Sequence, residues 1–410
     1  MHGRPVLMHP MLGQRLYVCQ GVDILPEGET FRRFVPDESI QYFPLCDDFG
    51  PMNLASVVRF VRQLDWELET FSTSVLLYVV DEGRRALTNA VFLLGAFMVI
   101  RLGFPVADVV RSCSGLLDPA LIAAYRDATF SPSDFDLTLV DCWGAIVKAM
   151  ELGWIELPGS LDDYRWGCVD VEEYEHYDDP LNGNVHEVVP GKFLAFPGPQ
   201  DLGGALYQDD ERGFRRFSPD FYADVFEDYG VTAVVRLNEP HYDRGRFAER
   251  GMEFHELEFE DCTAPPPAIV EAFLRVADTT AGAVAVHCKA GLGRTGTLIA
   301  VYLMRRHGFT AREAMGWLRI VRPGSVIGEQ QHYLCSAAAD EPQQPRVAEG
   351  GAGARGACLL AADVASGMER RGACRARVSW AGCPSGSELA GAVEAADRVL
   401  SRVSISQGDA

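Results

Sequence analysis

The decapeptide His287–Gly296, HCKAGLGRTG, constrains what this chain can fold into more than any other segment. An apolar run, Ala283–Val286, precedes it and a second one, Leu298–Met304, follows it, so the pattern predicts a strand, a loop and a helix. Glycines in the loop let backbone N–H groups turn inward without a Cβ clash. A helix that opens near Thr295 points its positive end at the same place. The segment therefore predicts a backbone cradle for an oxyanion.

Two side chains in this segment, Cys288 and Arg294, stand in the spacing Cys-x5-Arg. The planar guanidinium can bind two oxygens of one phosphate group. A cradle with a positive field favours the thiolate form of the cysteine, which is the nucleophilic form. A structural cysteine beside a Gly-rich turn would explain a bare Cys-x5-Arg equally well. The complete decapeptide in its strand–loop–helix context favours a nucleophilic cysteine.

The decapeptide resembles the signature of the cysteine-dependent protein tyrosine phosphatase superfamily. Several further segments resemble, in one order, the Cdc14 dual-specificity phosphatases; they are Phe49–Leu54 (FGPMNL), Glu173–Tyr177 (EYEHY), Pro190–Pro199, Val235–Asn238, Gly282–Leu298 and Arg322–Leu334. The resemblance implies an α/β fold with two tandem phosphatase-like domains, in which a central mixed sheet is flanked by helices. It implies that the first domain is degenerate and the second catalytic.

An internal repeat of strand, loop, helix, Gly-Phe turn and helix supports this organisation. The matched segments are Leu76–Val80 with Val284–Cys288, Ala90–Ala96 with Leu298–Met304, and Gly103–Phe104 with Gly308–Phe309. Val80 stands at the place of the nucleophile and Ala86 at the place of the arginine. Without a thiolate or a guanidinium, the first copy is predicted to have no catalytic activity.

The length of 410 residues is enough for two or three domains. The predicted domains are a degenerate domain over 10–163, an acidic linker helix over 164–188, a catalytic domain over 189–338 and a low-complexity tail over 339–410. The Gly/Ala/Arg run Gly350–Gly356 predicts that the tail is disordered, apart from one amphipathic helix at 387–403. Strands are expected at 75–80, 190–199, 233–237 and 253–258, and helices at 90–102, 164–179 and 268–278.

Cleavage of a phosphate ester through a cysteine needs a nucleophile, an oxyanion clamp, an acid for the leaving group and a group that positions water. Cys288 is the predicted nucleophile. The predicted clamp consists of the backbone amides of Lys289, Ala290, Gly291, Leu292, Gly293 and Arg294 together with the Arg294 side chain. The hydroxyl of Thr295 can donate a hydrogen bond to the thiolate. The resemblance implies that His287 orders the loop and does no acid–base work.

The predicted general acid is Asp261, which ends a predicted strand just before Pro265–Pro267. This position matches the general acid of the family, and the adjacent Glu260 is the alternative. After the first step, the same carboxylate would act as a base on water. Gln330 and Gln331 stand where, by resemblance, an amide orients the attacking water, and the sequence gives the two residues equal weight.

The resemblance implies a substrate class of phosphoserine or phosphothreonine followed by proline, with Lys or Arg shortly downstream, and also phosphotyrosine. An acidic groove would recognise the basic residue; the candidates for it are Glu172, Glu173, Glu175, Asp178, Asp179, Asp127 and Asp141. The net charge of −21 is compatible with basic substrates and argues against nucleic acid and anionic membranes as main partners.

The cysteines define neither a metal site nor a disulfide framework. The 11 cysteines contain no CxxC pair and no Cys/His cluster, so we expect no metal and no cofactor. Free thiols favour a reducing, intracellular compartment. The sequence has no signal-peptide pattern and no apolar stretch long enough to insert into a bilayer. The resemblance implies a place in the nucleus or cytoplasm, at the centrosome, spindle or cilium, and the reversal of cyclin-dependent-kinase phosphorylation in cell-cycle or cilium control.

Two other functions remain open at this point. The first is a phosphoinositide phosphatase, but lipid phosphatases of this superfamily tend to carry a second lysine in the loop. Here Leu292 occupies that position and Lys289 is the only lysine in the loop, which argues against this function. The second is a non-catalytic scaffold that binds phosphoproteins. The intact set of Cys288, Arg294, Thr295 and Asp261 argues against a scaffold.

Overall fold

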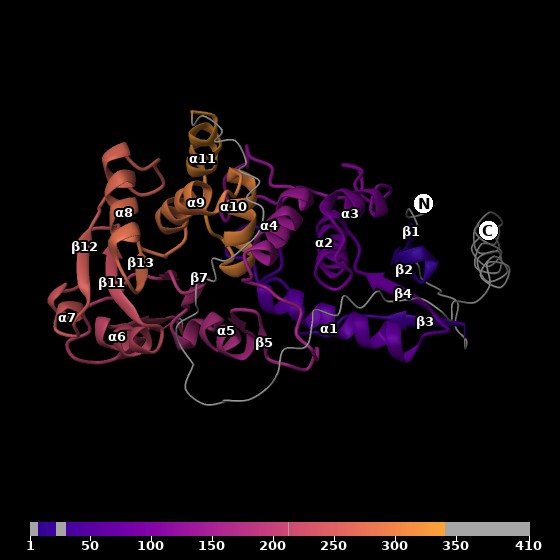
Figure 1. Ribbon diagram of the computed structural model, residues 1–410, viewed down its shortest axis with the longest axis horizontal. Coiled ribbons are helices and arrows are strands. Elements are labelled where there is room, and N and C mark those ends of the chain that lie inside the picture. The colour runs from indigo at the N-terminus through magenta and orange to yellow at the C-terminus, as the bar shows by residue number, and fades with distance from the viewer. Residues whose placement is uncertain (1–6, 22–29, 212, 341–410) are drawn as a thin grey trace, which may run out of the picture. The chain divides into compact units, whose positions relative to one another are not determined.

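The computed structural model describes residues 7–21, 30–211 and 213–340 (Figure 1). The predicted tail, with its helix at 387–403, lies outside these residues except for its first two positions. The described residues form two compact units: one holds the residues up to Asp37 together with Gln63–Gly83, and the other holds Glu38–Arg62 and the residues from Arg84 onward. Helix α1 (Leu54–Thr70) belongs to both. The domain limits at 163 and 188 stay predictions.

The first unit contains a four-stranded sheet in the order β1-β2-β4-β3. Its strands are β1 (Leu7–Met11), β2 (Leu16–Gln20), β3 (Phe31–Phe34) and β4 (Val75–Val80). The β1–β2 pair is antiparallel, and β4 is parallel to both of its neighbours. The apolar sequence VLLYVV puts β4 at the centre of the sheet, where apolar side chains on both faces can be buried. The predicted strand at 75–80 is confirmed.

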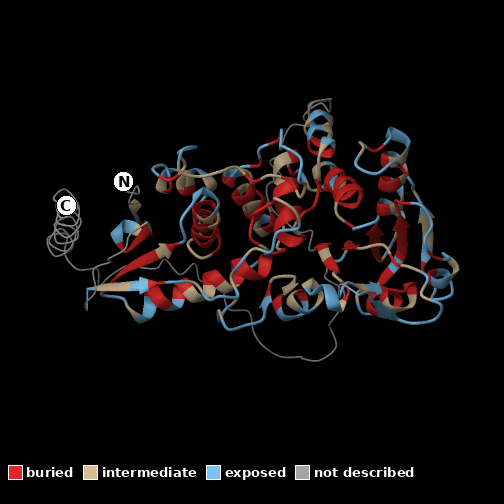
Figure 2. Cartoon of the chain, turned by 180° about the vertical axis from the view of Figure 1, so that it is seen from behind, coloured by how far each residue is buried: buried red, intermediate tan, exposed pale blue. Residues whose placement is uncertain are grey.

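The second unit contains a five-stranded sheet in the order β12-β11-β13-β8-β7. Its strands are β7 (His186–Val189), β8 (Phe193–Phe196), β11 (Val231–Arg236), β12 (Glu253–Glu256) and β13 (Ala283–His287). All neighbouring pairs are parallel except β7–β8. The central strands β8 and β13 are buried along their whole length, and their short apolar sequences explain that position (Figure 2).

Helices cover both faces of this sheet (Figure 1), and alternate apolar side chains of β8 pack against helices on opposite faces. Phe193 packs on Phe273 of α8 (Pro267–Thr279) and on Tyr302 of α9 (Gly293–His307), with ring centroids 5.4 and 4.9 Å away. Phe196 faces the opposite way, towards α6 (Pro219–Asp228). The layered α/β arrangement predicted for the catalytic part is therefore confirmed.

The internal repeat extends to the topology of the two sheets. The order β3-β4-β2-β1 matches β11-β13-β8-β7, and in both sheets the last pair is antiparallel. Strand β4 is thus the counterpart of β13. Helices α2 (Arg84–Ile100) and α3 (Val106–Ser112) follow β4 as α9 and α10 (Ala311–Val321) follow β13. Only 81–83 lies between β4 and α2, whereas 288–292 separates β13 from α9, so the first copy lacks the cradle as well as its side chains.

Helix α4 (Leu139–Glu151) packs closely against α10. A Cβ at Gly316 of α10 would lie 3.2 Å from the carbonyl oxygen of Asp141, so glycine permits this distance between the helices. A Cβ at Gly95 of α2 would lie within 2.1 Å of the Trp143 indole, which donates a hydrogen bond to the Phe92 carbonyl at 3.1 Å. Gly316 therefore lets α10 approach the backbone of α4, and Gly95 makes room for the Trp143 indole against α2.

The predicted helix at 164–179 is wrong in its first half. Only α5 (Val171–Asp178) is helical, and β5 (Arg165–Trp166) pairs with β6 (Val169–Asp170) as an antiparallel hairpin. The hairpin turns at Gly167, whose φ of +70° suits glycine and where a Cβ would lie 2.8 Å from the Glu156 nitrogen. The remaining elements are α7 (Gly245–Ala248), α11 (Glu329–Asp340), the hairpin β9 (Tyr207–Asp209) with β10 (Arg215–Phe217), and the 3-10 turns η1 (Leu12–Gln14) and η2 (Pro180–Asn182).

Candidate active site

The loop between β13 and α9, Cys288–Leu292, is called the cradle loop here. Cys288 follows the last residue of β13 and is 3% exposed. Gly291 has a φ of +69°, and a Cβ there would lie 2.0 Å from the Phe196 carbonyl oxygen, so only glycine fits. The N–H of Gly198 donates to the Lys289 carbonyl at 3.0 Å. The cradle loop is therefore held against the segment that follows β8.

The guanidinium of Arg294 is 2% exposed and lies in the first turn of α9. Its Nη1 donates to the carbonyl oxygens of Leu237 and Phe259 at 3.2 and 2.9 Å. Its Nε lies 3.1 Å from Oδ1 of Asp261, but no acceptor meets Nε at a hydrogen-bonding angle. The contact with Asp261 is therefore an ion pair without a hydrogen bond, and the Nε–H has no acceptor among the residues that the structure describes.

Asp261 lies on a loop with unusual backbone geometry beside the cradle. Its Oδ1 accepts a hydrogen bond from the N–H of Cys262 at 3.0 Å, and Cys262 has a φ of +61°. The Asp261 side chain is 50% exposed. An open cleft of about 530 Å³ brings together the predicted acid and parts of the predicted clamp; it is lined by Glu239, Glu258, Phe259, Glu260, Asp261, Lys289 and Arg294. The alternative acid Glu260 lines the same cleft.

His287 is buried behind the cradle loop and is neutral. Burial lowers the pKa of His287 to about 3. Its Nδ1 lies 3.0 Å from the Cys288 carbonyl oxygen, which can only accept, so Nδ1 carries the proton. Its Nε2 then accepts from the Tyr242 hydroxyl, 2.6 Å away. His287 therefore fixes the backbone at the start of the cradle loop.

The two neighbouring glutamines occupy different surroundings, which the sequence could not distinguish. Nε2 of Gln330 donates to the carbonyl of Thr263 at 3.2 Å, on the Asp261 loop, and its Oε1 would be 2.9 Å from a Cβ at Gly293. Oε1 of Gln331 instead accepts from Arg319 at 2.7 Å, and its Nε2 donates to the Gly328 carbonyl. Gln330 thus borders the cradle, whereas Gln331 supports the turn before α11.

Thr295 does not make the predicted hydrogen bond to the cysteine in this structure. Its side chain is fully buried, and Oγ1 has no hydrogen-bond partner among the described residues. Its neighbour Thr297, by contrast, donates to the Gly293 carbonyl at 2.8 Å. A buried hydroxyl without a partner is uncommon, and it leaves a donor free for an anion or for an ionised thiol.

A second cleft of about 660 Å³, called the groove here, adjoins the cradle loop through Leu292. Its lining residues are Gln41, Tyr42, Phe43, Leu45, Asn53, Glu175, Asp178, Asp179, Pro180, Asn184, His186, Leu292, Arg322 and Pro323. Of the predicted acidic candidates, Glu175, Asp178 and Asp179 line it. Glu175 forms a bidentate ion pair with Arg59 at 2.6 and 2.7 Å. Phe43 and Leu45 are 71% and 52% exposed, so one side of the groove is apolar.

The other acidic candidates lie outside the groove. Asp127 is 4% exposed and accepts from the N–H of Gly328 at 2.8 Å. Asp141 completes a capping box with Thr138 at the start of α4 and pairs with Arg312 at 3.1 Å. Glu172 is exposed and does not line the groove either. Hydrogen bonds inside the fold therefore account for Asp127 and Asp141.

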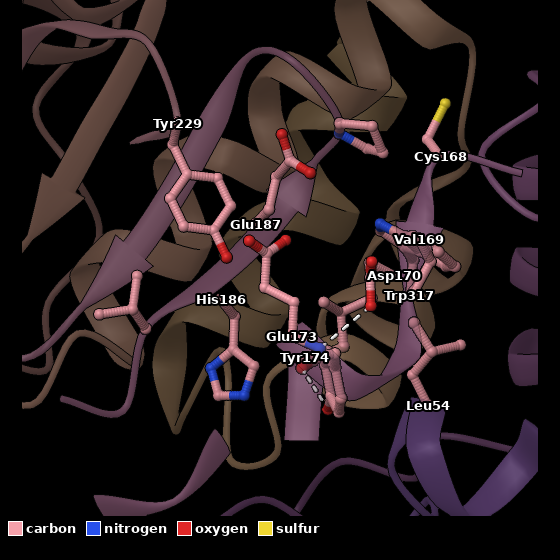
Figure 3. Close-up of a pocket in the computed structure, with 13 residues that line it drawn as sticks. Leu54, Cys168, Val169, Asp170, Glu173, Tyr174, His186, Glu187, Tyr229 and Trp317 are labelled. Carbon is pink, nitrogen blue, oxygen red and sulfur yellow. Dashed lines mark hydrogen bonds between the residues drawn. The ribbon is translucent and has the colours of Figure 1, made fainter. Parts of the chain in front are cut away.

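Glu173 borders a separate small cavity behind α5 (Figure 3). Its carboxylate points towards the hydroxyl of Tyr229, and Glu187 of β7 lies nearby. Glu187 accepts a hydrogen bond from the N–H of Gly191 at 2.6 Å. Burial, together with the smaller effect of the Glu173 charge, raises the pKa of Glu187 to about 7, while the N–H of Gly191 opposes the shift. Glu173 is exposed and Glu187 half-buried, and the pair lines this small cavity and not the groove.

The raised pKa of Glu187 predicts a pH-dependent stability. The folded protein binds this proton more tightly than the unfolded chain does, so the contribution is fully present below about pH 4.5 and is lost as pH rises to about 7. The loss is at most about 3 kcal/mol in the free energy of unfolding. The Glu187→Gln variant should therefore be more stable than the wild type at pH 8 but nearly equal to it at pH 5, as measured by denaturant unfolding.

The matched control for this prediction is Glu172→Gln, in which an exposed glutamate receives the same change. It should alter stability little at either pH, since exposed charges contribute little. A Glu187→Gln effect of the same size at both pH values would show that the carboxyl does not titrate differently in the folded protein.

Sequence reasoning missed three buried groups that hold the cradle: Arg322, His186 and Tyr242. Arg322 lies in the segment RPGSVIG and donates to the carbonyls of Gly291 and Ala290. The only signal for it was its place in a segment that carries the family resemblance. His186 and Tyr242 stand alone in the sequence, and nothing in their neighbours indicated a partner.

Among the described residues, no group of three His, Cys, Asp or Glu side chains could hold a metal ion, and no helix is long and apolar enough to cross a membrane.

Two family models match the chain. The model described as the N-terminal half of dual specificity protein phosphatases matches residues 10–149, and the model of the dual specificity phosphatase catalytic domain matches residues 225–338. The second match contains the cradle loop, Arg294 and Asp261. The first match contains β4 and α2, the degenerate copy of the repeat.

Similar curated proteins match about three quarters of the chain. Dual specificity protein phosphatase CDC14A of Homo sapiens is 41% identical over 305 residues, which cover 73% of this chain and 48% of that protein. CDC14B of Mus musculus is 38% identical over 303 residues, covering 73% and 59%. The CDC14 homolog of Schizosaccharomyces pombe is 33% identical over 321 residues, covering 75% and 57%. The chain thus spans about half to three fifths of the length of these relatives.

Proposed function

Because the chain belongs to the Cdc14 family of dual-specificity protein phosphatases, we propose that it hydrolyses phosphate esters of proteins through a phosphocysteine at Cys288. The observation that carries the proposal is the meeting of three groups at one cleft. The cradle loop and Arg294 come from one segment, the Asp261 carboxylate comes from another, and Nε of Arg294 lies 3.1 Å from Oδ1 of Asp261. A substrate phosphate in the cradle would contact all three.

In the first step the Cys288 thiolate attacks phosphorus, and the bond to the substrate oxygen breaks. Backbone N–H groups from Lys289 to Arg294 and the Arg294 side chain bind the equatorial oxygens. Arg294 is held in advance by two carbonyl oxygens and needs little reorganisation as charge develops. Its Nε–H, which lacks an acceptor, is free for a phosphate oxygen. The Thr295 hydroxyl is available to stabilise the thiolate.

Asp261 gives its proton to the leaving oxygen and then takes one from water in the second step. Its exposed carboxyl lies on the cleft beside Arg294, within the space that a bound phosphate ester would occupy. Gln330 is the residue that we assign to positioning the water, because it lies between the Asp261 loop and the start of α9. Gln331 keeps a supporting role through its bond to Arg319. Accumulation of the phosphocysteine in a Gln330→Ala variant tests this division.

The groove supports a substrate with phosphoserine or phosphothreonine followed by proline and a downstream Lys or Arg. Its apolar side chains next to the cradle, Leu45 and Leu292, would contact the proline ring. The carboxylates of Glu175 and Asp178 lie farther along α5 and would attract the basic side chain. The same cradle would accept phosphotyrosine. Cyclin-dependent kinases make phosphoserine and phosphothreonine sites that are followed by proline. We therefore assign the protein to the reversal of their phosphorylation in cell-cycle or cilium control. We place it in the nucleus or cytoplasm and at the centrosome, spindle or cilium.

The proposal is tested with two matched peptides and protein purified with EDTA and a thiol reductant. One peptide carries phosphoserine-Pro-x-Lys, and in the other the proline is replaced by alanine. We expect a higher kcat/KM for the proline peptide by about 10-fold or more, since one methylene group in an apolar pocket contributes about 1–3 kcal/mol. Equal rates would remove the assigned specificity. Hydrolysis of soluble inositol phosphates in preference to both peptides would favour a phosphoinositide phosphatase, and binding without turnover would favour a scaffold.

A further inference from the structure

Arg322 controls the direction in which part of the cradle loop faces. It follows the last turn of α10 and is 1% exposed. Its Nε donates to the Gly291 carbonyl at 2.8 Å, and its Nη2 donates to the Ala290 carbonyl at 3.1 Å. In a planar trans peptide the N–H points opposite to the C=O. By holding these two carbonyls on one side, Arg322 turns the N–H groups of Gly291 and Leu292 to the other side.

His186 links Arg322 to Asp178. Nη1 of Arg322 lies 2.7 Å from Nδ1 of His186, and a guanidinium can only donate. The His186 proton is therefore on Nε2, which donates to Oδ1 of Asp178 at 2.8 Å. Burial lowers the pKa of His186, in agreement with a neutral ring, although the charge of Asp178 opposes that shift. This tautomer makes a continuous series of donors from the cradle loop to Asp178.

Asp178 is the end of this series that a substrate can reach. It lies at the end of α5, its side chain is 33% exposed, and it lines the groove. Its second oxygen accepts from the Asn53 side chain at 3.0 Å, so the carboxylate is fixed on both sides. Of the other two groove acids, Glu175 forms an ion pair with Arg59 and Asp179 accepts a hydrogen bond from the N–H of Leu181 at 2.8 Å, so neither is part of this path.

We propose that Asp178, His186 and Arg322 are positioning residues that set the amide directions of the cradle loop from within the groove. The carboxylate at Asp178 holds His186, His186 together with Asn184 holds Nη1 of Arg322, and Arg322 holds the loop carbonyls. Asp178 thus affects phosphate binding and chemistry even for substrates that never enter the groove. This inference rests on the proposed function for its catalytic part, whereas its binding part needs only an oxyanion in the cradle.

The test uses a small aryl phosphate and inorganic phosphate, neither of which is large enough to fill the groove. The Asp178→Asn variant keeps the size and one acceptor of the side chain but loses its charge, and charge-assisted hydrogen bonds are roughly twice as strong as neutral ones. We expect kcat for the aryl phosphate to fall about 3- to 10-fold and phosphate binding, measured by calorimetry, to weaken by a similar factor. Asp178→Glu, which keeps the charge, should recover part of both.

The matched control is Asp220→Asn. Asp220 is 31% exposed, lies on α6 and pairs with Arg246, and it lines neither the groove nor the Asp261 cleft. This variant should leave kcat and phosphate affinity unchanged. A merely structural role for Asp178 would lower the melting temperature without moving phosphate affinity in the folded protein.

Failure of the two proposals is distinguishable. If the wild type hydrolyses the aryl phosphate and Asp178→Asn matches it in kcat and phosphate affinity, the relay is wrong and the proposed function stands. An equal loss in Asp178→Asn and Asp220→Asn would also overturn the relay. If the wild type shows no turnover at all, the proposed function fails. A weaker phosphate affinity of Asp178→Asn alone would then still support the relay.

Discussion

Phosphate release by the Cys288→Ser variant is expected to fall by a factor of about 10⁴ or more, because removing the nucleophile of a covalent mechanism leaves only binding and electrostatics. A serine hydroxyl is a much weaker acid than a thiol and stays protonated near neutral pH, so it does not replace the nucleophile. The side chains have nearly the same shape, so the cradle should keep its affinity for phosphopeptide. The measurement is phosphate release with the proline peptide, together with binding of the same peptide by fluorescence anisotropy.

The control is Cys335→Ser, in which a half-buried thiol of α11 outside both clefts is changed in the same way. Burial raises the pKa of Cys335, so this thiol is not activated, and its loss should leave turnover near that of the wild type. Retained turnover in Cys288→Ser would show that another group attacks the phosphate. Loss of binding as well as turnover would show that the substitution damages the cradle.

The Asp261→Asn variant should separate substrates by their leaving groups. With a phosphoserine peptide, kcat should fall on the order of 10²- to 10³-fold, because the alkoxide of serine cannot leave without a proton. With an aryl phosphate that carries electron-withdrawing groups, the loss should be much smaller, since its phenolate leaves unaided. Asparagine keeps the size of the side chain and the acceptor for the Cys262 N–H, so the loop conformation should persist.

Glu260→Gln is the matched control, because Glu260 is exposed, precedes Asp261 and lines the same cleft. A leaving-group-dependent loss in Glu260→Gln and none in Asp261→Asn would transfer the acid role to Glu260. Equal losses for both substrates in Asp261→Asn would instead mean that Asp261 orients Arg294 through their ion pair and does not transfer a proton.

The strand, loop and helix around Cys288 could be predicted because every signal there is local. Apolar runs, glycines and the Cys-x5-Arg spacing all lie within 283–304. The helix predicted at 268–278 and the strand at 253–258 depend on equally local patterns, and α8 and β12 lie where they were expected. The helix predicted over the first half of 164–179 is wrong because Gly167 takes a positive φ and turns the chain into a hairpin, which an isolated glycine signals only weakly.

The environment of each charged residue could not be predicted, because its partner is distant in the sequence. Asp127 is bonded to the N–H of Gly328 and Arg322 to His186, contacts that only the fold creates. Asp141 is an exception, because its partner Thr138 lies only three residues away. The Thr-x-x-Asp pattern at 138–141 is a local capping-box signal, and it indicates a role at the start of α4 and not in the groove. The distinct surroundings of Gln330 and Gln331 likewise depend on which side of α11 each one faces.

The central claim is that the phosphoryl group passes through Cys288, and rapid acid quench followed by peptide mass spectrometry tests it most directly. The Gln330→Ala variant should be mixed with excess phosphopeptide, because slower attack by water lets the intermediate accumulate. The account predicts one added phosphoryl group on the peptide that contains Cys288, more of it in Gln330→Ala than in the wild type, and none in Cys288→Ser. Turnover with no phosphorylated Cys288 in either active protein, or with the group on another residue, would contradict it.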